Sequence, residues 1–287
     1  MIHSEQANFS VSWMCVVLGV ARSAYYAWLK RPVSKRAQED ARLLPRIEEH
    51  HKASRGTYGS TRITDDLKDE GETVGHNRVA RIMKEHAIVG KPLKKFVVTT
   101  DSKHELEVAP NLLQREFEAD APNQVWVGDI TYAWTWRGWA YLATVIDLFG
   151  RTVVGWELAD HMSADLVVRA FEKACAVRDV KPGLIFHSDR GSQYASDAFK
   201  KVLEKHGAIA SMSRKGDCWD NAVAESFFAT IKRELLNRAI WMNLGCVRAA
   251  IHEYIEVFYN RKRRHSANGN ISPAEYERLY NKAAEAA

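Results

Sequence analysis

Three acidic side chains lie in surroundings that point to chemistry. Asp129 interrupts an apolar strand-like run at residues 125–133, Asp189 directly follows a short apolar segment, and Glu225 lies one turn inside a predicted helix. A buried carboxylate is costly unless it is paired or bound to a cation, and clusters of carboxylate oxygens suit Mg²⁺ or Mn²⁺. The sequence therefore predicts Asp129, Asp189 and Glu225 as metal ligands and catalytic residues.

Spacing alone does not establish that assignment. Asp and Glu occupy 36 of the 287 positions, so an acid falls at any chosen offset about one time in eight. Taken singly, Glu225 is more simply a solvated helix residue and Asp189 a turn former. The elements that carry the three residues decide whether they can meet.

The second half of the chain predicts a sheet with helices. Residues 125–133, 139–148 and 152–159 are rich in Val, Ile, Thr, Tyr and Trp, which are typical of strands. The tight Phe149-Gly150-Arg151 link predicts that the last two are antiparallel neighbours. The later elements are a helix at 163–178, a strand at 184–187, a helix at 196–206, a strand at 208–213 and a long helix from Asn221. This order predicts a mixed α/β fold in which the three acids can converge on one edge of the sheet.

The first part of the chain predicts helices only. Residues 10–18, 21–30, 39–52, 60–70 and 76–86 have helical spacing, the third of them despite Pro45. Helix, short turn and helix is the layout of helix-turn-helix DNA readers, and the polar side of the last helix carries Arg78, Arg81 and Lys84. These three are predicted DNA contacts, although helical hairpins that bind no DNA are common. The polar, irregular residues 91–123 predict a linker.

Composition narrows the class of protein. No apolar run reaches the length of a membrane-spanning helix, and the acidic Glu5 ahead of the first apolar patch argues against a signal peptide. The 4 cysteines lie far apart, so we expect reduced thiols in a cytoplasm and neither a zinc site nor a disulfide framework. The net charge is +5. Basic residues outnumber acidic ones at 190–265 and are outnumbered at 121–189, which favours a metal site beside a phosphate-binding surface. An ordinary solvated basic helix face remains the alternative.

Three strings in the second half resemble one known family. They are HSDRGSQY at residues 187–194, GDCWDNAVAESFF at 216–228 and FYNRKRRHS at 258–266. All three resemble the OrfB transposases of bacterial copy-out–paste-in insertion sequences, whose catalytic core is similar to that of retroviral integrases. Further strings that look like motifs of the family are GDITY at 128–132, VIDLFGR at 145–151 and TYG at 57–59, so nearly the whole chain is covered. The sequence departs from the family at residues 266–270, where a leucine and an aromatic are more usual.

The resemblance implies a fold and a layout of domains. The fold would be α/β, with a ribonuclease-H-like core made of a mixed five-stranded sheet flanked by helices, preceded by all-α helix-turn-helix modules. The predicted domains are an N-terminal helix-turn-helix segment at 1–36, a second helical DNA-binding module at 37–90, the linker at 91–123, the catalytic core at 124–240 and a C-terminal helical basic tail that completes the core at 241–287.

The resemblance also implies an activity. Asp129, Asp189 and Glu225 would be a DDE triad that holds two Mg²⁺ or Mn²⁺ ions, nicks insertion-sequence ends and transfers the 3′-OH to double-stranded DNA. Lys232, about two helical turns after Glu225, would contact element-end DNA, with a solvated lysine as the alternative. Such an enzyme would act as a homo-oligomer on DNA, with a possible OrfA partner or fusion, in the bacterial cytoplasm at the nucleoid.

Other side chains have simpler expected roles. A basic run predicted to bind phosphates, or else only to cover the surface, comprises Arg261, Lys262, Arg263 and Arg264. Four tryptophans expected to be core and strand residues, and not base-stacking platforms, are Trp126, Trp134, Trp136 and Trp139. Two alternatives to transposition stay open: a nuclease of the same fold that only hydrolyses DNA, and a non-catalytic DNA-binding regulator.

Overall fold

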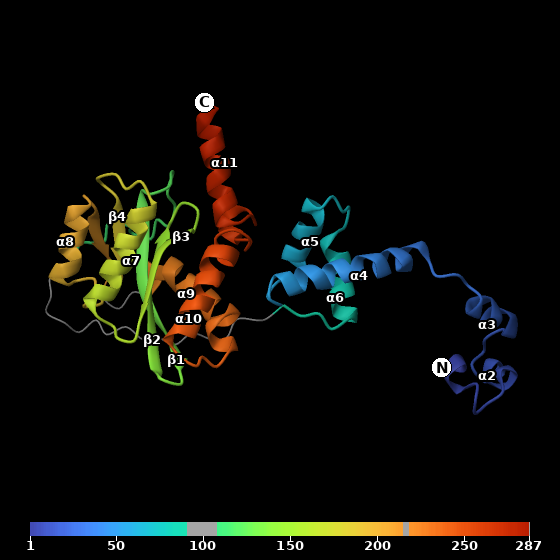
Figure 1. Ribbon diagram of the computed structural model, residues 1–287. Helices are drawn as coiled ribbons and strands as arrows, with labels where there is room; N and C mark the ends of the chain where they lie inside the picture. Colours follow the sequence, from blue (N-terminus) through green and yellow to red (C-terminus); the bar gives the residue numbers. More distant parts are fainter. Residues whose placement is uncertain (91–107, 215–217, 287) are drawn as a thin grey trace.

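A computed structural model describes residues 1–90, 108–214 and 218–286. The chain begins with three short helices, α1 (Ile2–Glu5), α2 (Val11–Val17) and α3 (Arg22–Leu29), which lie away from the rest of the molecule in Figure 1. Among the described residues no helix has the length and apolar character needed to cross a membrane.

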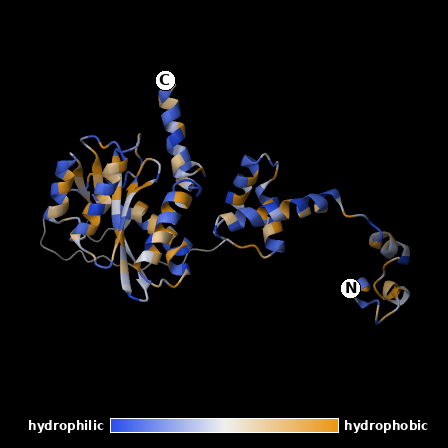
Figure 2. Cartoon of the chain, in the orientation of Figure 1, coloured by the Kyte–Doolittle hydropathy of each residue, from blue (hydrophilic) through white to orange (hydrophobic). Residues whose placement is uncertain are grey.

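A three-helix module follows, made of α4 (Lys35–Ala53), α5 (Ser60–Asp69) and α6 (His76–Glu85). Its helices pack around a small apolar core that includes Leu43, Ile47, Ile63, Leu67 and Val79. The spacing of these residues places them on one face of each helix, which is why the sequence predicted the helices. Pro45 lies inside α4 without ending it. The outer surface of α4 is mostly hydrophilic (Figure 2).

The second half of the chain forms a five-stranded sheet in the order β3-β2-β1-β4-β5. The strands are β1 (Val125–Thr135), β2 (Gly138–Asp147), β3 (Val153–Ala159), β4 (Ile185–Ser188) and β5 (Ile209–Met212). The first three are antiparallel, and β4 and β5 join as parallel strands. The predicted mixed sheet is therefore confirmed. Since β4 pairs with β1 only from Val125 to Gly128, the β1–β2 hairpin extends beyond its neighbours.

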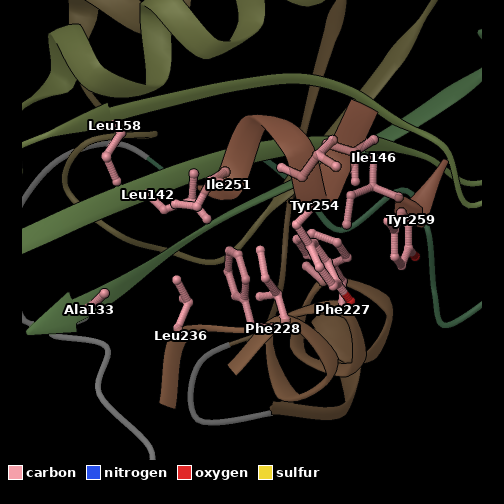
Figure 3. Close-up of a cluster of buried hydrophobic side chains, with 14 of the residues drawn as sticks. Ala133, Leu142, Ile146, Leu158, Phe227, Phe228, Leu236, Ile251, Tyr254 and Tyr259 are labelled. Carbon is pink, nitrogen blue, oxygen red and sulfur yellow. The ribbon is translucent and has the colours of Figure 1, made fainter. Parts of the chain in front are cut away.

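Helices cover both faces of the sheet. One face packs against α7 (Ala164–Val177) and α8 (Asp197–Lys205), around Trp126 and Phe171. The other packs against α9 (Ala222–Glu234), α10 (Leu244–His252) and the π-helical continuation of α10, η3 (Glu253–Tyr259). Figure 3 shows Phe227 and Phe228 of α9 beside Tyr254 of η3, under the strands. Residues beyond 241 thus supply part of this core; the chain ends with α11 (Pro273–Glu285).

The stretch before β1 also belongs to this packing. Residues 91–107 of the predicted linker lie outside the described residues, but from Val108 onward the chain runs along the sheet domain. Leu113 is buried in the core beneath α9, and the Nε of Arg115 is 3.0 Å from Asp220 Oδ1. Residues 108–123 are therefore part of the folded domain that contains the sheet, because apolar side chains such as Leu113 pack into its core.

A buried ion pair joins the end of α9 to the C-terminal region. Arg263 donates to Glu234 through Nε and Nη2, both at 2.9 Å, and Tyr254 Oη donates to the same carboxylate at 2.8 Å. Arg263 and Glu234 are almost fully buried. Burial raises the cost of both charges, and the pair with its shared hydrogen bonds offsets that cost.

The next residue ties the three-helix module to the sheet domain. Arg264 Nε lies 2.6 Å from Asp66 Oδ1 in α5, and the backbone N–H of Arg264 donates to Tyr58 Oη at 2.7 Å. Arg55 pairs with Glu253 and stacks over the Phe258 ring, 5.0 Å from its centroid. Arg264 and Arg55 therefore join the three-helix module to the C-terminal helices of the sheet domain.

We predict that Arg263→Ala lowers the free energy of unfolding by about 3–5 kcal/mol, because it leaves the Glu234 carboxylate buried without its main partner. Urea unfolding followed by circular dichroism measures the loss. Arg261→Ala, at an exposed position two residues earlier, is the matched control and should change stability by less than about 0.5 kcal/mol. Wild-type stability in Arg263→Ala would contradict the structural role of the pair.

Candidate active site

Asp129 lies in β1 just past the point where β4 stops pairing with it. Its Oδ1 accepts a hydrogen bond of 2.7 Å from the backbone N–H of Ile130. The preceding Gly128 allows a close approach, since a Cβ there would stand 2.4 Å from Phe186 Cζ and 3.3 Å from Tyr194 Oη. Glycine at 128 therefore lets two aromatic rings pack beneath the strand at the position that carries the acid.

Asp189 follows β4 and is oriented by its own turn. The backbone N–H of Gly191 donates to Asp189 Oδ1 at 2.9 Å. A Cβ on Gly191 would lie only 3.0 Å from that oxygen, so a larger residue would disturb the carboxylate. The turn thus fixes the side chain at the carboxyl end of β4, next to the strand that carries Asp129.

Glu225 and Lys232 come from α9, which packs across β1. Both side chains are half-buried. The Nζ of Lys232 lies 4.7 Å from the centroid of the Tyr132 ring, a cation–π contact with β1. The helix therefore brings one acid and one base to the part of β1 that carries Asp129.

The charges of these residues act on one another. Burial raises the pKa of Asp129 well above its usual value, and the negative charges of Asp189 and Glu225 raise it further, while Lys232 lowers it. Burial and the charge of Asp189 raise the pKa of Glu225. Burial lowers the pKa of Lys232, and the charge of Asp129 opposes that shift. The predicted triad and Lys232 are therefore one electrostatic group.

The three acids of the predicted triad are nevertheless not gathered tightly. In residues 1–90, 108–214 and 218–286, no three His, Cys, Asp or Glu side chains are gathered closely enough to hold one ion between them. The three acids thus lie within electrostatic range of one another, on three elements of the sheet domain, without forming a closed set of ligands.

A fourth acid, Asp220, holds the start of α9. It is 1% exposed, and its carboxylate accepts from Arg214 Nη2 at 2.9 Å, Arg115 Nε at 3.0 Å and Asn111 Nδ2 at 2.9 Å. The backbone N–H and Nε of Arg214 donate to the same group. Hydrogen bonds from Arg214 keep the pKa of Asp220 well below its usual range, against the effect of burial. Asp220 is therefore a fixed anion, five residues before Glu225.

His187 joins that anion to the strand before Asp189. Its Nε2 lies 3.0 Å from the carbonyl oxygen of Asp220 and donates to it, so Nδ1 accepts from Ser211 Oγ at 2.8 Å. Burial lowers the pKa of His187, which agrees with a neutral ring. The sequence did not single out Asp220 or His187, because an acid before a helix is the pattern of an ordinary cap.

Comparisons with known proteins identify the family. An Integrase core domain model matches residues 119–218, a second Integrase core domain model matches 206–273, and an HTH-like domain model matches 38–96. The chain is 45% identical over 271 residues to the Insertion element IS600 uncharacterized 31 kDa protein of Shigella sonnei, covering 94% of this chain and 100% of that protein. It is 40% identical over 278 residues to Transposase InsF for insertion sequence IS3A of Escherichia coli (strain K12), covering 96% of each. The chain belongs to the IS3-type insertion-sequence transposases.

The transposase is accordingly an enzyme of DNA transposition, a polynucleotidyl transferase with an integrase core. A solved structure, the simian T-cell lymphotropic virus intasome in complex with PP2A regulatory subunit B56 gamma, gives a TM-score of 0.47 at 13% identity, over 80% of this chain and 74% of that one.

The basic residues predicted to contact DNA fall into two groups, those that pair with acids of the same chain and those that are exposed. Arg78 Nε lies 2.7 Å from Asp40 Oδ1 and Arg81 Nη2 lies 2.6 Å from Asp40 Oδ2, so both guanidinium groups of α6 pair with α4. Lys84 is exposed.

In the C-terminal basic run, Arg261 and Lys262 are exposed, whereas Arg263 and Arg264 form the internal ion pairs described above. A short string of basic letters gives no sign of which members point inward, because a turn and not a helix carries them.

The tryptophans also differ from expectation. Trp126 is fully buried, as predicted. Trp134 and Trp139 lie in strands, as predicted, but Trp134, Trp136 and Trp139 are exposed by 57%, 69% and 46%, so the prediction that these three belong to the core is wrong. The reason is that the hairpin extends past β4 and β3, and only the face that carries Ala133 and Ala140 packs against the core there.

We predict that Asp220→Asn lowers the rate of strand transfer by up to about 100-fold, because it frees the start of α9 and displaces Glu225. The rate is measured on labelled element ends, alongside thermal unfolding. Asp160→Asn, which alters an exposed acid, is the control and should leave the rate unchanged. An unaltered rate in Asp220→Asn would remove the positioning role.

Proposed function

We propose that Asp129, Asp189 and Glu225 are the catalytic residues with which this transposase breaks a phosphodiester at each end of its element and joins the freed 3′-OH to DNA. One observation supports this most directly. Asp129 on β1 and Glu225 on α9 both have a raised pKa, first because of burial and then because of neighbouring negative charge, to which Asp189 after β4 contributes in both cases. Perturbed carboxylates that share one site are a mark of function.

The donor set fits divalent cations. It consists of carboxylate oxygens, which Mg²⁺ and Mn²⁺ prefer, and the raised pKa of Asp129 is a cost that a bound cation would remove. Binding would draw the three side chains together from their open arrangement. Bound there, such ions lower the pKa of an attacking hydroxyl and stabilise the leaving oxygen. Two ions per site is part of the proposal.

The chain's own residues then have defined tasks. Asp129, Asp189 and Glu225 would hold the cations against the reacting phosphate, while Lys232 neutralises negative charge on the DNA beside them. The Tyr132 ring beneath Lys232 Nζ limits where the ammonium can go, so the lysine is held at the site. The displacement is in-line and direct, so no bond between protein and DNA forms. The same residues serve hydrolysis and strand transfer, and the nucleophile alone distinguishes them.

Recognition of the element ends falls to other parts of the chain in this proposal. The three-helix module would read DNA, with Lys84 available at once and Arg78 and Arg81 released from Asp40 when phosphates replace it. Arg261 and Lys262 would add phosphate contacts. The proposed domain boundaries are those expected from the sequence, 1–36, 37–90, 91–123, 124–240 and 241–287, except that residues 108–123 join the sheet domain. Assembly as a homo-oligomer on DNA at the nucleoid, with an OrfA partner or fusion, belongs to the same proposal.

We predict that Glu225→Gln reduces nicking and joining by at least about 100-fold, because it removes one ligand and almost no volume. Strand transfer of labelled element ends is measured with Mg²⁺, with Mn²⁺ and with excess EDTA, which should abolish it. Binding of the same DNA should be retained. The matched control is Glu204→Gln, the same change at an exposed helical position in α8. Full activity of Glu225→Gln, or full activity in EDTA, would refute the triad.

A second prediction uses stability and not turnover. The fold raises the pKa of Asp129 above its unfolded value, so the ionised form costs stability, and the cost grows as pH rises from the unfolded pKa toward the folded one. Asp129→Asn should therefore unfold at a higher temperature than wild type near neutral pH in EDTA. Adding Mg²⁺ should stabilise the wild type more than the variant. If Asp129→Asn unfolds in EDTA at or below the temperature of the wild type, the Asp129 charge does not destabilise the fold and the prediction is wrong.

A further inference from the structure

The β1–β2 hairpin carries a row of aromatic rings called here the aromatic strip, made of the half-buried Tyr132 and the exposed Trp134, Trp136 and Trp139. Its three tryptophans are exposed by 57%, 69% and 46%. Exposed tryptophans gathered in one place are unusual on a surface that meets only water, and such patches mark binding sites. The hairpin that bears them projects beyond the other strands (Figure 1).

Most of the strip is one continuous row of contacts. The Tyr132 and Trp139 rings meet edge to face with centroids 5.0 Å apart, and Trp139 meets Trp134 in the same way at 4.9 Å. Trp134 and Trp139 face each other across the two strands, so both point to one side of the hairpin. Neighbouring rings hold each other in place, which makes the row a rigid surface.

The row begins at the proposed active site. Lys232 Nζ lies 4.7 Å from the centroid of the Tyr132 ring, and Lys232 is within electrostatic range of Asp129. Because side chains alternate along β1, Asp129 points to the face covered by α9 and Tyr132 to the other, and Lys232 lies close to both. A strand that leaves Asp129 around Lys232 and runs toward the tip of the hairpin would pass Tyr132 first, then Trp139 and Trp134. The strip is thus an extension of the site and not a separate patch.

The charges around the strip favour a polyanion. No Asp or Glu occurs from Ile130 to Ile146, and Arg137 is exposed at the tip of the hairpin. Lys232 lies at one end of the strip and Arg137 at the other, so phosphates beside the rings would meet a cation at each end. Aromatic rings between cations are the chemistry that binds unpaired nucleotides, whose base faces stack on the rings.

We propose that the aromatic strip stacks unpaired bases of the DNA strand whose end occupies the active site. Bases inside a duplex already stack on each other and offer no free face, so the strip selects nucleotides that have left the helix. It would hold the strand next to the scissile phosphate in one path. The proposal rests on the proposed active site only for its location, because stacking needs no metal.

The test measures binding without chemistry. The full-length protein in EDTA is titrated with a blunt duplex and with the same duplex carrying a short single-stranded tail. Trp134→Ala and Trp139→Ala should each weaken binding of the tailed duplex by about 5- to 150-fold, the effect of one lost base stack. Trp134→Phe should restore most of it, since a ring remains. Binding of the blunt duplex should stay unchanged.

A matched control and a direct readout accompany the titration. Ile209→Ala truncates an apolar side chain of similar exposure, at 47%, on the edge strand β5 and should bind like wild type. With 2-aminopurine in the tail, stacking in the wild type should quench its fluorescence, and Trp134→Ala should abolish the quenching. This result stands even if Glu225→Gln proves active, so failure of the triad and failure of the strip are told apart.

Three outcomes would overturn the proposal. Variants that bind tailed duplex as tightly as wild type does would leave the strip without a role in DNA binding. An equal loss for blunt and tailed duplex would make it a general DNA contact. Unchanged DNA binding together with a smaller assembly by analytical ultracentrifugation would make the strip an interface between two copies of the chain.

Discussion

Like charges held close together are the constraint on which the rest of this transposase depends. Asp129 and Glu225 have raised pKa values because of burial and of the negative charges beside them, so the fold gains no stability from gathering these acids. A local arrangement of this kind persists only where packing elsewhere fixes the backbone that carries it. Because β1, the turn after β4 and α9 each carry one acid, the proposed site is a property of the whole sheet domain.

Helix α9 shows how that placement is enforced. Asp220 holds its start through Arg214 and Arg115, and Glu234 holds its end through a bidentate pair with Arg263. Between them the apolar face of the helix packs under the sheet (Figure 3). Both anchors are buried, where a charge without its partner is very costly, so the helix cannot slide without breaking one of them. The position of Glu225 is thereby set by the two ends of its own helix.

Much of this could be predicted from the sequence, and the remainder could not, for a physical reason. Strands and helices followed from residue types and periodicity, and the order of elements indicated the mixed sheet, because apolar faces must be buried together. Asp129 was conspicuous since it interrupts an apolar strand. Asp220 was not, because two of its hydrogen-bond donors, Asn111 and Arg115, lie more than a hundred residues earlier in the chain. The exposure of Trp134 was missed for the same reason: periodicity says which way a side chain points, but not whether another element covers it.

The sequence also does not show which basic residues are already paired inside the protein. Arg78, Arg81, Arg263 and Arg264 all pair with carboxylates of the same chain, although the sequence suggested that each would meet DNA. Arg263 and Arg264, neutralised inside the protein, release no counterion when DNA binds, and Arg78 and Arg81 must first give up Asp40, so the number of basic residues overstates the electrostatic surface. Affinity for DNA must then come from fewer exposed cations together with contacts that are not ionic. The exposed rings of the β1–β2 hairpin would supply such contacts, close to the point where the proposed site must hold a strand for chemistry.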